Sequence, residues 1–406
     1  MKPRRLPLGE LLAPLERFVR IEASGGIVLA LATIVALQWA NSRWSAGYQH
    51  LWQFRPVALL PEASLRFCVN DGLMTIFFLV VGLEIRRELH DGALADRRVA
   101  ALPLIAALGG MCVPALIYLA LARDATLLRG WAIPTATDIA FAIGALTLLA
   151  RRAAPALRPL LLGLAIIDDI GAVLVIACFY ARALELAALG VAAGATAVLW
   201  WLRAAPARAA VLRLLAGAVL WTALLRAGVH PSIAGVIAGL VVPVGAPRAA
   251  APEAAEQPRS PAERLQERLH PWVAFAVMPL FALANAGIDL RGLELHEGTA
   301  RVLVVSIVCA LTLGKPLGIV LATLVGVRLR LCSLPPATTP AALVVVGLLG
   351  GIGFTMSIFI AALAFPDPAL LSAAKLGVLI ASIIAALAGL TLGAVLGRGP
   401  RDQSTA

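Results

Sequence analysis

Long hydrophobic runs separated by short polar segments recur along the whole 406-residue chain. Each run has roughly 17 to 25 residues, which is the length a helix needs to cross about 30 Å of hydrocarbon. Twelve such runs, numbered here as spans 1 to 12, cover residues 16–40, 66–85, 101–122, 131–150, 157–180, 184–202, 211–226, 229–243, 271–288, 301–325, 339–364 and 369–396. The pattern predicts an all-α polytopic membrane protein with twelve transmembrane helices.

Two longer polar segments interrupt this pattern. Residues 41–64 are rich in aromatic side chains and are expected to form a small hairpin or an interfacial helix on the periplasmic side. Residues 244–270 are rich in Pro, Ala and charge, and predict a cytoplasmic linker that ends in a short amphipathic helix, PAERLQERLHPW. This linker divides the chain into eight spans and four.

Spans 4 and 11 are poorly suited to form continuous helices. Span 4 contains GWAIPTATDIAFAIG, with a proline, hydroxyl and acid side chains and a glycine within one crossing. Span 11 contains GLLGGIGFTMSIF, which has Gly347, Gly350, Gly351 and Gly353. Broken backbone at membrane depth is tolerated only where it is buried in protein or lines an aqueous cavity. We therefore predict two broken, crossing helices.

The two broken spans occupy matching positions in the chain. Each is the middle member of a group of three, spans 3–5 and spans 10–12, and the two groups enter the membrane from opposite sides. This pattern is typical of inverted-repeat transporters with a binding site near the membrane midplane. Glycine for close helix packing or a proline kink would explain either span alone, but not both at matching positions.

Composition and charge agree with a membrane location. The chain is 61% hydrophobic and 14% charged, with a mean hydropathy of +0.91, outside the usual range of soluble globular proteins. With the N-terminus in the cytoplasm, the cytoplasmic segments hold 23 Lys and Arg and the opposite loops hold 9. This asymmetry predicts that both termini are cytoplasmic. The net charge of +11 forms no patch interleaved with exposed aromatics, so we expect no nucleic-acid partner.

Few charged residues lie in the interior of the spans, and the candidates there are Asp71, Asp138, Asp168, Asp169, Lys315 and Lys375. Ionisable residues at this depth are candidates for function. Adjacent residues on a helix point about 100° apart, so Asp168 and Asp169 cannot both face one cation. One is expected to face a cavity, where Asp138 can join it. The other needs a different partner, and Lys315 is the basic residue nearest the middle of a span in the second repeat.

Buried carboxyl groups suggest a specific chemistry. An aqueous Asp side chain has a pKa of about 3.9, and burial can raise the pKa of a carboxyl group by up to about three to five units. Such a group binds either a proton or a hard monovalent cation, and each excludes the other. Competition of this kind, combined with alternating access, predicts cation/proton exchange. The sequence shows no catalytic nucleophile, cofactor-binding loop or metal-ligand cluster, so no cofactor is expected.

Other classes of protein also carry intramembrane acids. Structural salt bridges or hydrogen-bonded core acids are the simplest alternative for this set. Membrane-embedded aspartyl proteases need two acids on different helices and a GxGD-like motif, and polyprenyl transferases need carboxylates spaced about four residues apart. Here the acid pair is contiguous and no GxGD-like motif occurs, and the nearest transferase candidate, Asn70-Asp71, has no downstream acid until Glu84. A passive cation channel remains an alternative, and it would not need a site that binds protons.

Several motifs together resemble the NhaA-type bacterial sodium/proton antiporters. They are FFLVVGLEIRREL (77–89), TATDIAFAIGAL (135–146), LAIIDDIGAVLVIA (164–177), GVHPSIAGVIAG (228–239), LHPWVAFAVMPLFALANAG (269–287), GKPLGI (314–319) and GGIGFTMSIFIAALAF (350–365). This family is a standard example of the inverted-repeat architecture, so the resemblance and the argument from broken spans are not independent. The resemblance covers nearly the whole chain.

The resemblance implies roles for individual site residues. Asp169 is the expected principal carrier of Na⁺, Li⁺ and protons, with Asp168 beside it, and Thr137 and Asp138 lie at the crossing of the broken helices. Asp138 would offset the positive helix ends, and Lys315 would offset the negative ends and pair with Asp168. A two-proton, electrogenic cycle is also implied. The residues implied in pH sensing are Glu84, Arg87, Glu88 and His230.

The resemblance also implies an organisation for the chain. Residues 1–406 would form one integral antiporter unit in the bacterial inner membrane. A core domain would come from about 101–180 and 301–396, and an interface domain, which commonly dimerises, from about 16–100 and 184–288. Two features depart from the family: Gln266-Glu267 stand where members often carry Glu-His, and residues 41–64 match only loosely the hairpin that holds dimers together.

Overall fold

All the regular structure in the described part of the chain is helical. The computed structural model describes residues 8–56, 63–90, 92, 95, 97–149, 157–181, 184–245, 260–291, 298–335 and 338–396, and the side chains of residues 8–23, 97, 98 and 207 lie outside this description. An all-α membrane protein was predicted, and the all-helical class is confirmed for these residues.

The elements follow one another without a strand in these ranges. They are α1 (Leu8–Ala40), α2 (Ser45–Gln53), α3 (Leu65–Phe67), η1 (Cys68–Leu73), α4 (Met74–His90), α5 (Arg97–Leu121), η2 (Leu128–Thr135), α6 (Ile139–Leu148), α7 (Leu157–Phe179), α8 (Leu186–Leu202), η3 (Ala207–Ala209), α9 (Ala210–Arg226), α10 (Ile233–Val241), α11 (Pro261–Trp272), η5 (Val273–Val277), α12 (Met278–Asn285), α13 (Gly298–Cys309), η6 (Ala310–Gly314), α14 (Lys315–Arg328), α15 (Pro340–Gly350), α16 (Phe354–Ala364) and α17 (Pro368–Leu396). Three of them, η1, η5 and η6, are single π-helical segments inside longer helices; such segments are frequent at functional sites.

The described helices account for some of the twelve predicted spans. In the described ranges, six continuous helical runs are long and apolar enough to cross a membrane, and two bent helix pairs raise the number to as many as eight. The predicted spans 211–226 and 229–243 correspond to α9 and α10, and α10, with nine residues, is only about 14 Å long. The count of twelve therefore stays a prediction.

Both polar segments contain helices. Residues 45–53 form the helix α2, so this part of the 41–64 segment is helical, whereas residues 57–62 lie outside the description. The expected amphipathic helix at the end of the linker is α11, and a capping box between Ser260 and Glu263 fixes its start. Residues 246–259 of the linker also lie outside the description.

Both spans predicted to be broken are interrupted. The 3₁₀ helix η2 ends at Thr135, and extended backbone at Ala136 and Asp138 separates it from α6. Helix α15 ends at Gly350, and α16 leaves it at an angle of 48°. The two interruptions meet, because the backbone N–H of Asp138 donates to the carbonyl of Ile352 at 2.7 Å.

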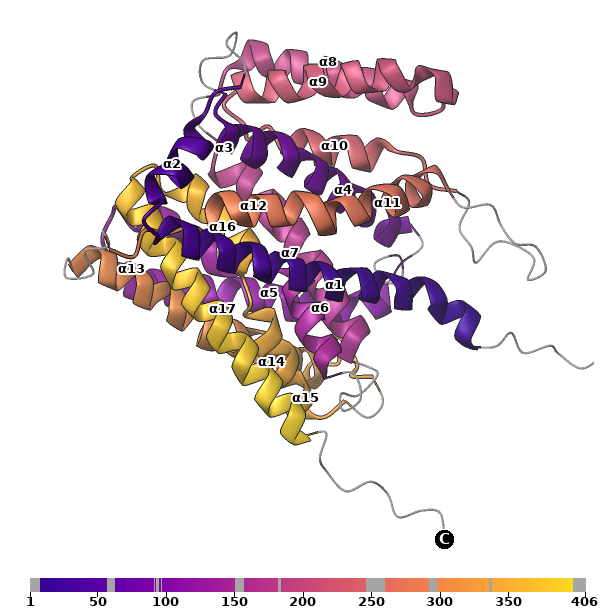
Figure 1. Cartoon of the computed structure of the whole chain (residues 1–406). Helices are drawn as coiled ribbons and strands as arrows, with labels where there is room; N and C mark the ends of the chain where they lie inside the picture. The colour runs from indigo at the N-terminus through magenta and orange to yellow at the C-terminus, as the bar shows by residue number, and fades with distance from the viewer. Residues whose placement is uncertain are drawn as a thin grey trace, which may run out of the picture.

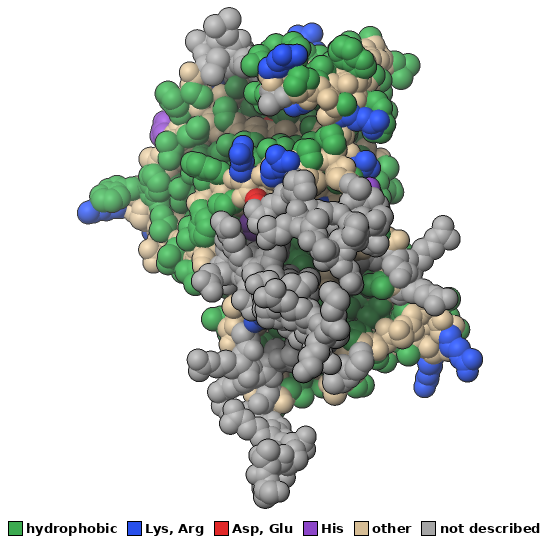
Figure 2. Space-filling model, turned by 90° about the vertical axis from the view of Figure 1, so that its right-hand side faces the viewer, with side chains coloured by type: hydrophobic (Ala, Val, Ile, Leu, Met, Phe, Trp, Pro, Cys, Tyr) green, Lys and Arg blue, Asp and Glu red, His purple; other side chains and the backbone are tan. Residues whose placement is uncertain are grey.

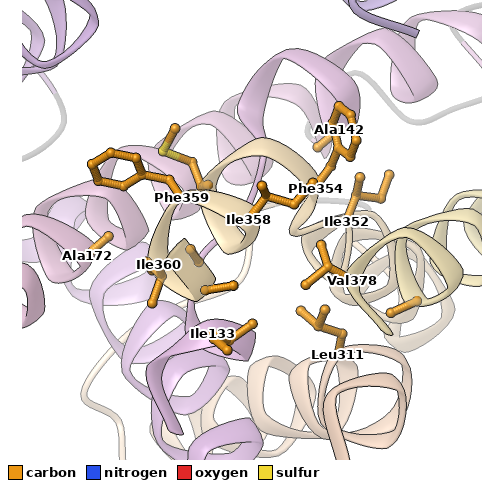
Figure 3. Packing of buried hydrophobic residues seen from close by; sticks show 14 of the residues in the cluster. Ile133, Ala142, Ala172, Leu311, Ile352, Phe354, Ile358, Phe359, Ile360 and Val378 are labelled. Carbon is orange, nitrogen blue, oxygen red and sulfur yellow. The ribbon is translucent and has the colours of Figure 1, made fainter. Parts of the chain in front are cut away.

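Helix α16 lies at the centre of the hydrophobic core. Nine of its side chains are buried, as expected for a helix that is apolar on all sides. Figure 3 shows Ile358, Phe359 and Ile360 of this helix surrounded by side chains of η2, α6, α7, η6 and α17. The second half of span 11 is therefore held by protein and not by lipid.

The helices are arranged in a large body with a smaller layer along one edge (Figure 1). Helices α8, α9 and α10 share a separate hydrophobic cluster that includes Leu199, Leu220 and Ala234. Helix α10 joins this layer to α4 at very close range, because Gly82 lies against the backbone of Val236. Figure 2 views the bundle from the right-hand end of Figure 1, where several Lys and Arg side chains lie among hydrophobic ones.

Candidate functional site

Asp138 lies between the two interrupted spans and is only 1% exposed. Its Oδ1 accepts a hydrogen bond from the backbone N–H of Phe141 at 3.1 Å, in the first turn of α6. Its Oδ2 accepts from the backbone N–H of Thr355 at 3.1 Å and from the Thr355 hydroxyl, in the first turn of α16. One carboxylate therefore caps two helices.

This double cap has a clear electrostatic basis. The first turn of a helix carries unsatisfied N–H groups and a partial positive charge equivalent to about half an elementary charge. Two such ends meet at Asp138, which is nearly fully buried. A single carboxylate charge matches the sum of the two partial charges. This contact geometry fits the charge-compensating role that the resemblance implies for Asp138.

Lys315 lies at the negative end of η2, the first half of interrupted span 4. It is the first residue of α14 and is fully buried. Its Nζ lies 2.9 Å from Asp168 Oδ2 and donates to the carbonyl of Thr135, the last residue of η2, at 2.7 Å. The ion pair between Asp168 and Lys315 that the resemblance implies is thus present. A buried pair of this kind is costly to break from one side, because the remaining charge is left uncompensated.

Thr137 connects Asp168 to the second interrupted span. Its hydroxyl lies 2.6 Å from Asp168 Oδ2 and 2.8 Å from the carbonyl of Gly350, the last residue of α15. The other oxygen of Asp168, Oδ1, is buried and accepts no hydrogen bond from the described residues. Asp168, Thr137 and Lys315 thus form one buried group at the crossing.

Asp169 has different surroundings from Asp168. It follows Asp168 on α7, is 6% exposed and lines a cavity of about 50 Å³. Asp138 and Thr137 line the same cavity, together with Glu84 of α4 and His270 of α11. The volume corresponds to about one or two water molecules. Adjacent residues on a helix point about 100° apart. Asp168 therefore faces Thr137 and Lys315, and Asp169 faces the cavity.

Several polar residues near the site were not identified from the sequence. Thr355 binds Asp138, the Ser357 hydroxyl donates to the carbonyl of Ile133 at 2.7 Å, and Ser382 Oγ accepts from the N–H of Phe354 at 3.1 Å. The hydroxyls in GFTMSIF were a visible signal for the first two. Ser382 lies in an ordinary stretch of α17 and gave no signal.

The residues implied in pH sensing are only partly brought together. Glu84 lines the cavity and accepts a hydrogen bond from Gln266 Nε2 at 3.3 Å. Arg87 and Glu88 form an ion pair at 3.3 Å near the end of α4, where the Arg87 side chain is 34% exposed. Gln266, which departs from the family pattern, therefore contacts Glu84, and Glu84 shares the cavity with Asp169.

His230 lies apart from these residues. Its Nε2 is 3.4 Å from Asp71 Oδ1, and its Nδ1 is 2.7 Å from the Ser232 hydroxyl. Asp71 and Glu84 are separated by thirteen residues along η1 and α4, which is about 20 Å of helix. The structure thus places His230 beside the other end of this span from Glu84.

Comparison with known proteins gives consistent results. The sequence profile of the family described as Na⁺/H⁺ antiporter 1 matches residues 16–392. The chain is 52% identical over 401 residues to the Na(+)/H(+) antiporter NhaA of Acidovorax sp. (strain JS42), covering 97% of this chain and 94% of that one. It is 47% identical over 431 residues to the protein of the same name from Janthinobacterium sp. (strain Marseille), with 96% and 95% covered.

A solved structure shows the same fold. The sodium proton antiporter MjNhaP1 from Methanocaldococcus jannaschii aligns with a TM-score of 0.53 over 96% of this chain and 99% of that one. The sequence identity is 13%, so this likeness concerns the fold alone.

Proposed function

The chain belongs to the Na⁺/H⁺ antiporter 1 family, and we propose that it exports cytoplasmic Na⁺ or Li⁺ in exchange for external H⁺ through Asp168 and Asp169. As a member of this family it is a multi-pass membrane transporter and not an enzyme. The observation that carries the proposed mechanism is the buried Asp169 carboxylate, which faces a cavity beside the meeting point of two interrupted helices.

Competition for the carboxylates would couple the two ions. A deprotonated Asp169 offers a negative charge and oxygen ligands, which suit a hard monovalent cation. A protonated Asp169 offers neither. Na⁺ and H⁺ therefore exclude each other, and a conformational change that exposes the site alternately to each side exchanges one ion for the other.

The cavity indicates the side from which the site is reached. Glu84 lies near the end of α4, and His270 lies near the end of α11. Helix α4 ends and helix α11 begins at the face seen in Figure 2, with Glu84 six residues and His270 nine residues in from it along these helices. We assign this face to the cytoplasm, because it carries the Lys-rich and Arg-rich segments of the sequence. Alternating access would then open the site to the opposite face.

The aspartates can be tested directly. Asp169→Asn and Asp138→Asn should each abolish Na⁺-driven proton flux in reconstituted vesicles, because an amide neither carries a proton nor supplies the charge that holds the ion. Asp367→Asn is a matched control, since Asp367 is exposed and caps α17 through the N–H of Ala369. Wild-type exchange in either site variant would refute the assignment.

A second proton-binding group would make the cycle electrogenic. We propose that Na⁺ binding displaces one proton from Asp169 and one from the Asp168–Lys315 pair, so two protons enter for each Na⁺ exported. The support is that Lys315 and Asp168 are paired at 2.9 Å inside the site. One net charge then crosses in each cycle, and the membrane potential contributes about 2.3 kcal/mol per 100 mV.

Voltage separates this cycle from a one-for-one exchange. In liposomes, an inside-negative potential imposed with K⁺ and valinomycin should accelerate exchange and shift the Na⁺ gradient at which net flux reverses. A reversal point that does not respond to voltage would mean an electroneutral cycle, in which Lys315 only holds the interrupted helices together.

We propose the following organisation for the whole chain. Twelve spans would cross the bacterial inner membrane with both termini in the cytoplasm. Spans 3–5 and 10–12 would form inverted repeats in a core domain (about 101–180 and 301–396), and the remaining spans would form an interface domain that makes a homodimer. The supports are the family relationship and the matching interruptions of spans 4 and 11.

We further propose that pH regulates transport through Glu84, Arg87, Glu88 and His230, in the service of Na⁺ and pH homeostasis. The position of Glu84 on the cavity supports this for one member of the set. His230 would act from the other end of the span, through its contact with Asp71.

A further inference from the structure

Helix α2 turns sharply away from the first span. Helix α1 ends at Ala40, and α2, which begins at Ser45, makes an angle of 114° with it. In Figure 1, α2 lies at the left-hand edge of the bundle, across the end of α1 and beside α3. A helix in this position runs closer to the plane of the membrane than to its normal.

One side of α2 is fixed to the protein. Tyr48 and Trp52 are 2% and 3% exposed, and they stand one turn apart on the same side of the helix. The Tyr48 hydroxyl donates to the carbonyl of Leu283 in α12 at 2.7 Å, and its ring packs edge-on against Trp39 of α1. These contacts fix which sides of α2 face outward.

The outward sides differ in polarity. With about 100° between successive residues, Trp44 and Leu51 fall on one stripe, and Phe54 follows just beyond the end of the helix. These three side chains are 64%, 38% and 61% exposed. Gln49 and Gln53 are also exposed, and they fall on a different side, turned by more than a quarter circle from the apolar stripe. The helix therefore has a protein side, an apolar side and a polar side.

Positive charge marks both ends of the apolar stripe. Arg43 precedes Trp44, and its Cζ lies 5.1 Å from the centre of the Trp44 ring. Arg55 follows Phe54, and both arginines are exposed. Trp beside Arg is typical of the membrane–water boundary, where the ring lies among headgroups and the cation reaches phosphate.

We propose that α2 is a membrane-interface anchor whose partner is the phospholipid headgroup layer. Trp44, Leu51 and Phe54 would enter the boundary between headgroups and acyl chains, Arg43 and Arg55 would bind lipid phosphates, and the glutamine side would face water. A second copy of the chain fits this stripe less well. The arginines at both ends of the stripe favour lipid phosphate, whereas a second copy would bring the same positive charges to the contact.

Depth-sensitive spin labelling tests this assignment in the full chain. The five native cysteines, Cys68, Cys112, Cys178, Cys309 and Cys332, are replaced by alanine, and Leu51→Cys, Trp44→Cys and Gln53→Cys are made one at a time. Each labelled protein is reconstituted into vesicles of phosphatidylethanolamine and phosphatidylglycerol. Collision rates are measured with oxygen, which concentrates in lipid, and with a nickel chelate, which stays in water. Na⁺-driven proton flux is recorded for each variant as the check on folding.

The anchor predicts that labels at 44 and 51 collide with oxygen severalfold more, relative to nickel, than the label at 53. Adding Arg43→Gln and Arg55→Gln, or removing phosphatidylglycerol, should move the label at 51 toward water. Equal nickel access at 51 and 53 would overturn the proposal. So would strong spin–spin broadening between copies at 51, because a second copy would then cover the stripe.

Discussion

Thr355 holds Asp138 in place with two groups, its backbone N–H and its hydroxyl, both of which donate to Oδ2. Thr355 is fully buried and Asp138 nearly so, so water does not readily replace these hydrogen bonds. Hydrogen bonds to charged groups typically contribute about 1.5–3 kcal/mol. The hydroxyl of Thr355 is therefore expected to matter for the position and the charge of Asp138, and through it for transport.

Substitution at this position separates the hydroxyl from the packing. Thr355→Val keeps the shape but removes the donor, and it should reduce Na⁺-driven exchange by about tenfold or more, as the loss of a bond in this range implies. Thr355→Ser restores the donor and should recover most of the rate despite losing a methyl group. If valine transports as well as serine, then Asp138 is held by the backbone alone and the hydroxyl has no positioning role.

The residue scale also shows what the sequence was able to reveal. Asp168, Asp169 and Asp138 stood out because charge inside an apolar run needs an explanation. The partner of Asp138 did not, since Thr355 lies 217 residues away and no local pattern connects the two. Hydroxyl side chains in apolar helices often bond their own backbone, as Thr33 and Thr147 do here, so their functional contacts appear only once the fold is known.

At the scale of elements, glycine decides how closely helices approach. Gly314 and Gly318 lie one turn apart around the start of α14 and face α5. A Cβ at Gly314 would stand 2.9 Å from Pro114 Cα, and one at Gly318 would overlap the backbone carbonyl of Gly109. Small residues at this spacing allow helix backbones to touch inside membranes. This contact holds Lys315 between the two glycines and fixes its approach to Asp168.

Gly318→Ala should therefore destabilise the protein by about 1–3 kcal/mol, the usual cost of overpacking, and lower its melting temperature in detergent. Because the obstruction is backbone, the neighbours cannot rotate away. Gly190→Ala on α8 is the matched control, since nothing lies within 4 Å of a Cβ there. This control should be neutral or gain about 0.5–1 kcal/mol. Equal melting temperatures for the two variants would contradict the close approach.

Elements differed in how well the sequence predicted them. The interruptions of spans 4 and 11 followed from Pro134 and the glycine cluster. The π-helical segments η1, η5 and η6 carry no comparable signal, because they depend on packing against neighbours. Residues 41–64 left two alternatives open, and the choice of a helix at 45–53 depends on Tyr48 packing against Trp39 of α1 and donating to Leu283 of α12.

At the scale of the whole molecule, two opposite arrangements of charge meet in the middle of an apolar bundle. Asp138 joins the positive ends of α6 and α16, and Lys315 joins the negative end of η2 to Asp168. Around the crossing, the charges of Asp138, Asp168 and Lys315 are thus each balanced by a helix end or by an ion pair. Asp169 faces the cavity instead, and it is there that an ion would arrive.

The measurement that tests this account most directly is the apparent Na⁺ affinity for exchange in proteoliposomes as a function of pH. Mutually exclusive binding predicts that, below the pH at which the site releases its protons, the affinity falls about tenfold per pH unit if one proton competes and more steeply if two do. The same series with Asp169→Asn should show no exchange at any pH. A Na⁺ affinity that stays constant from about pH 6 to about pH 9, across the range in which buried carboxyl groups titrate, would contradict competition at these carboxylates and with it the proposed mechanism.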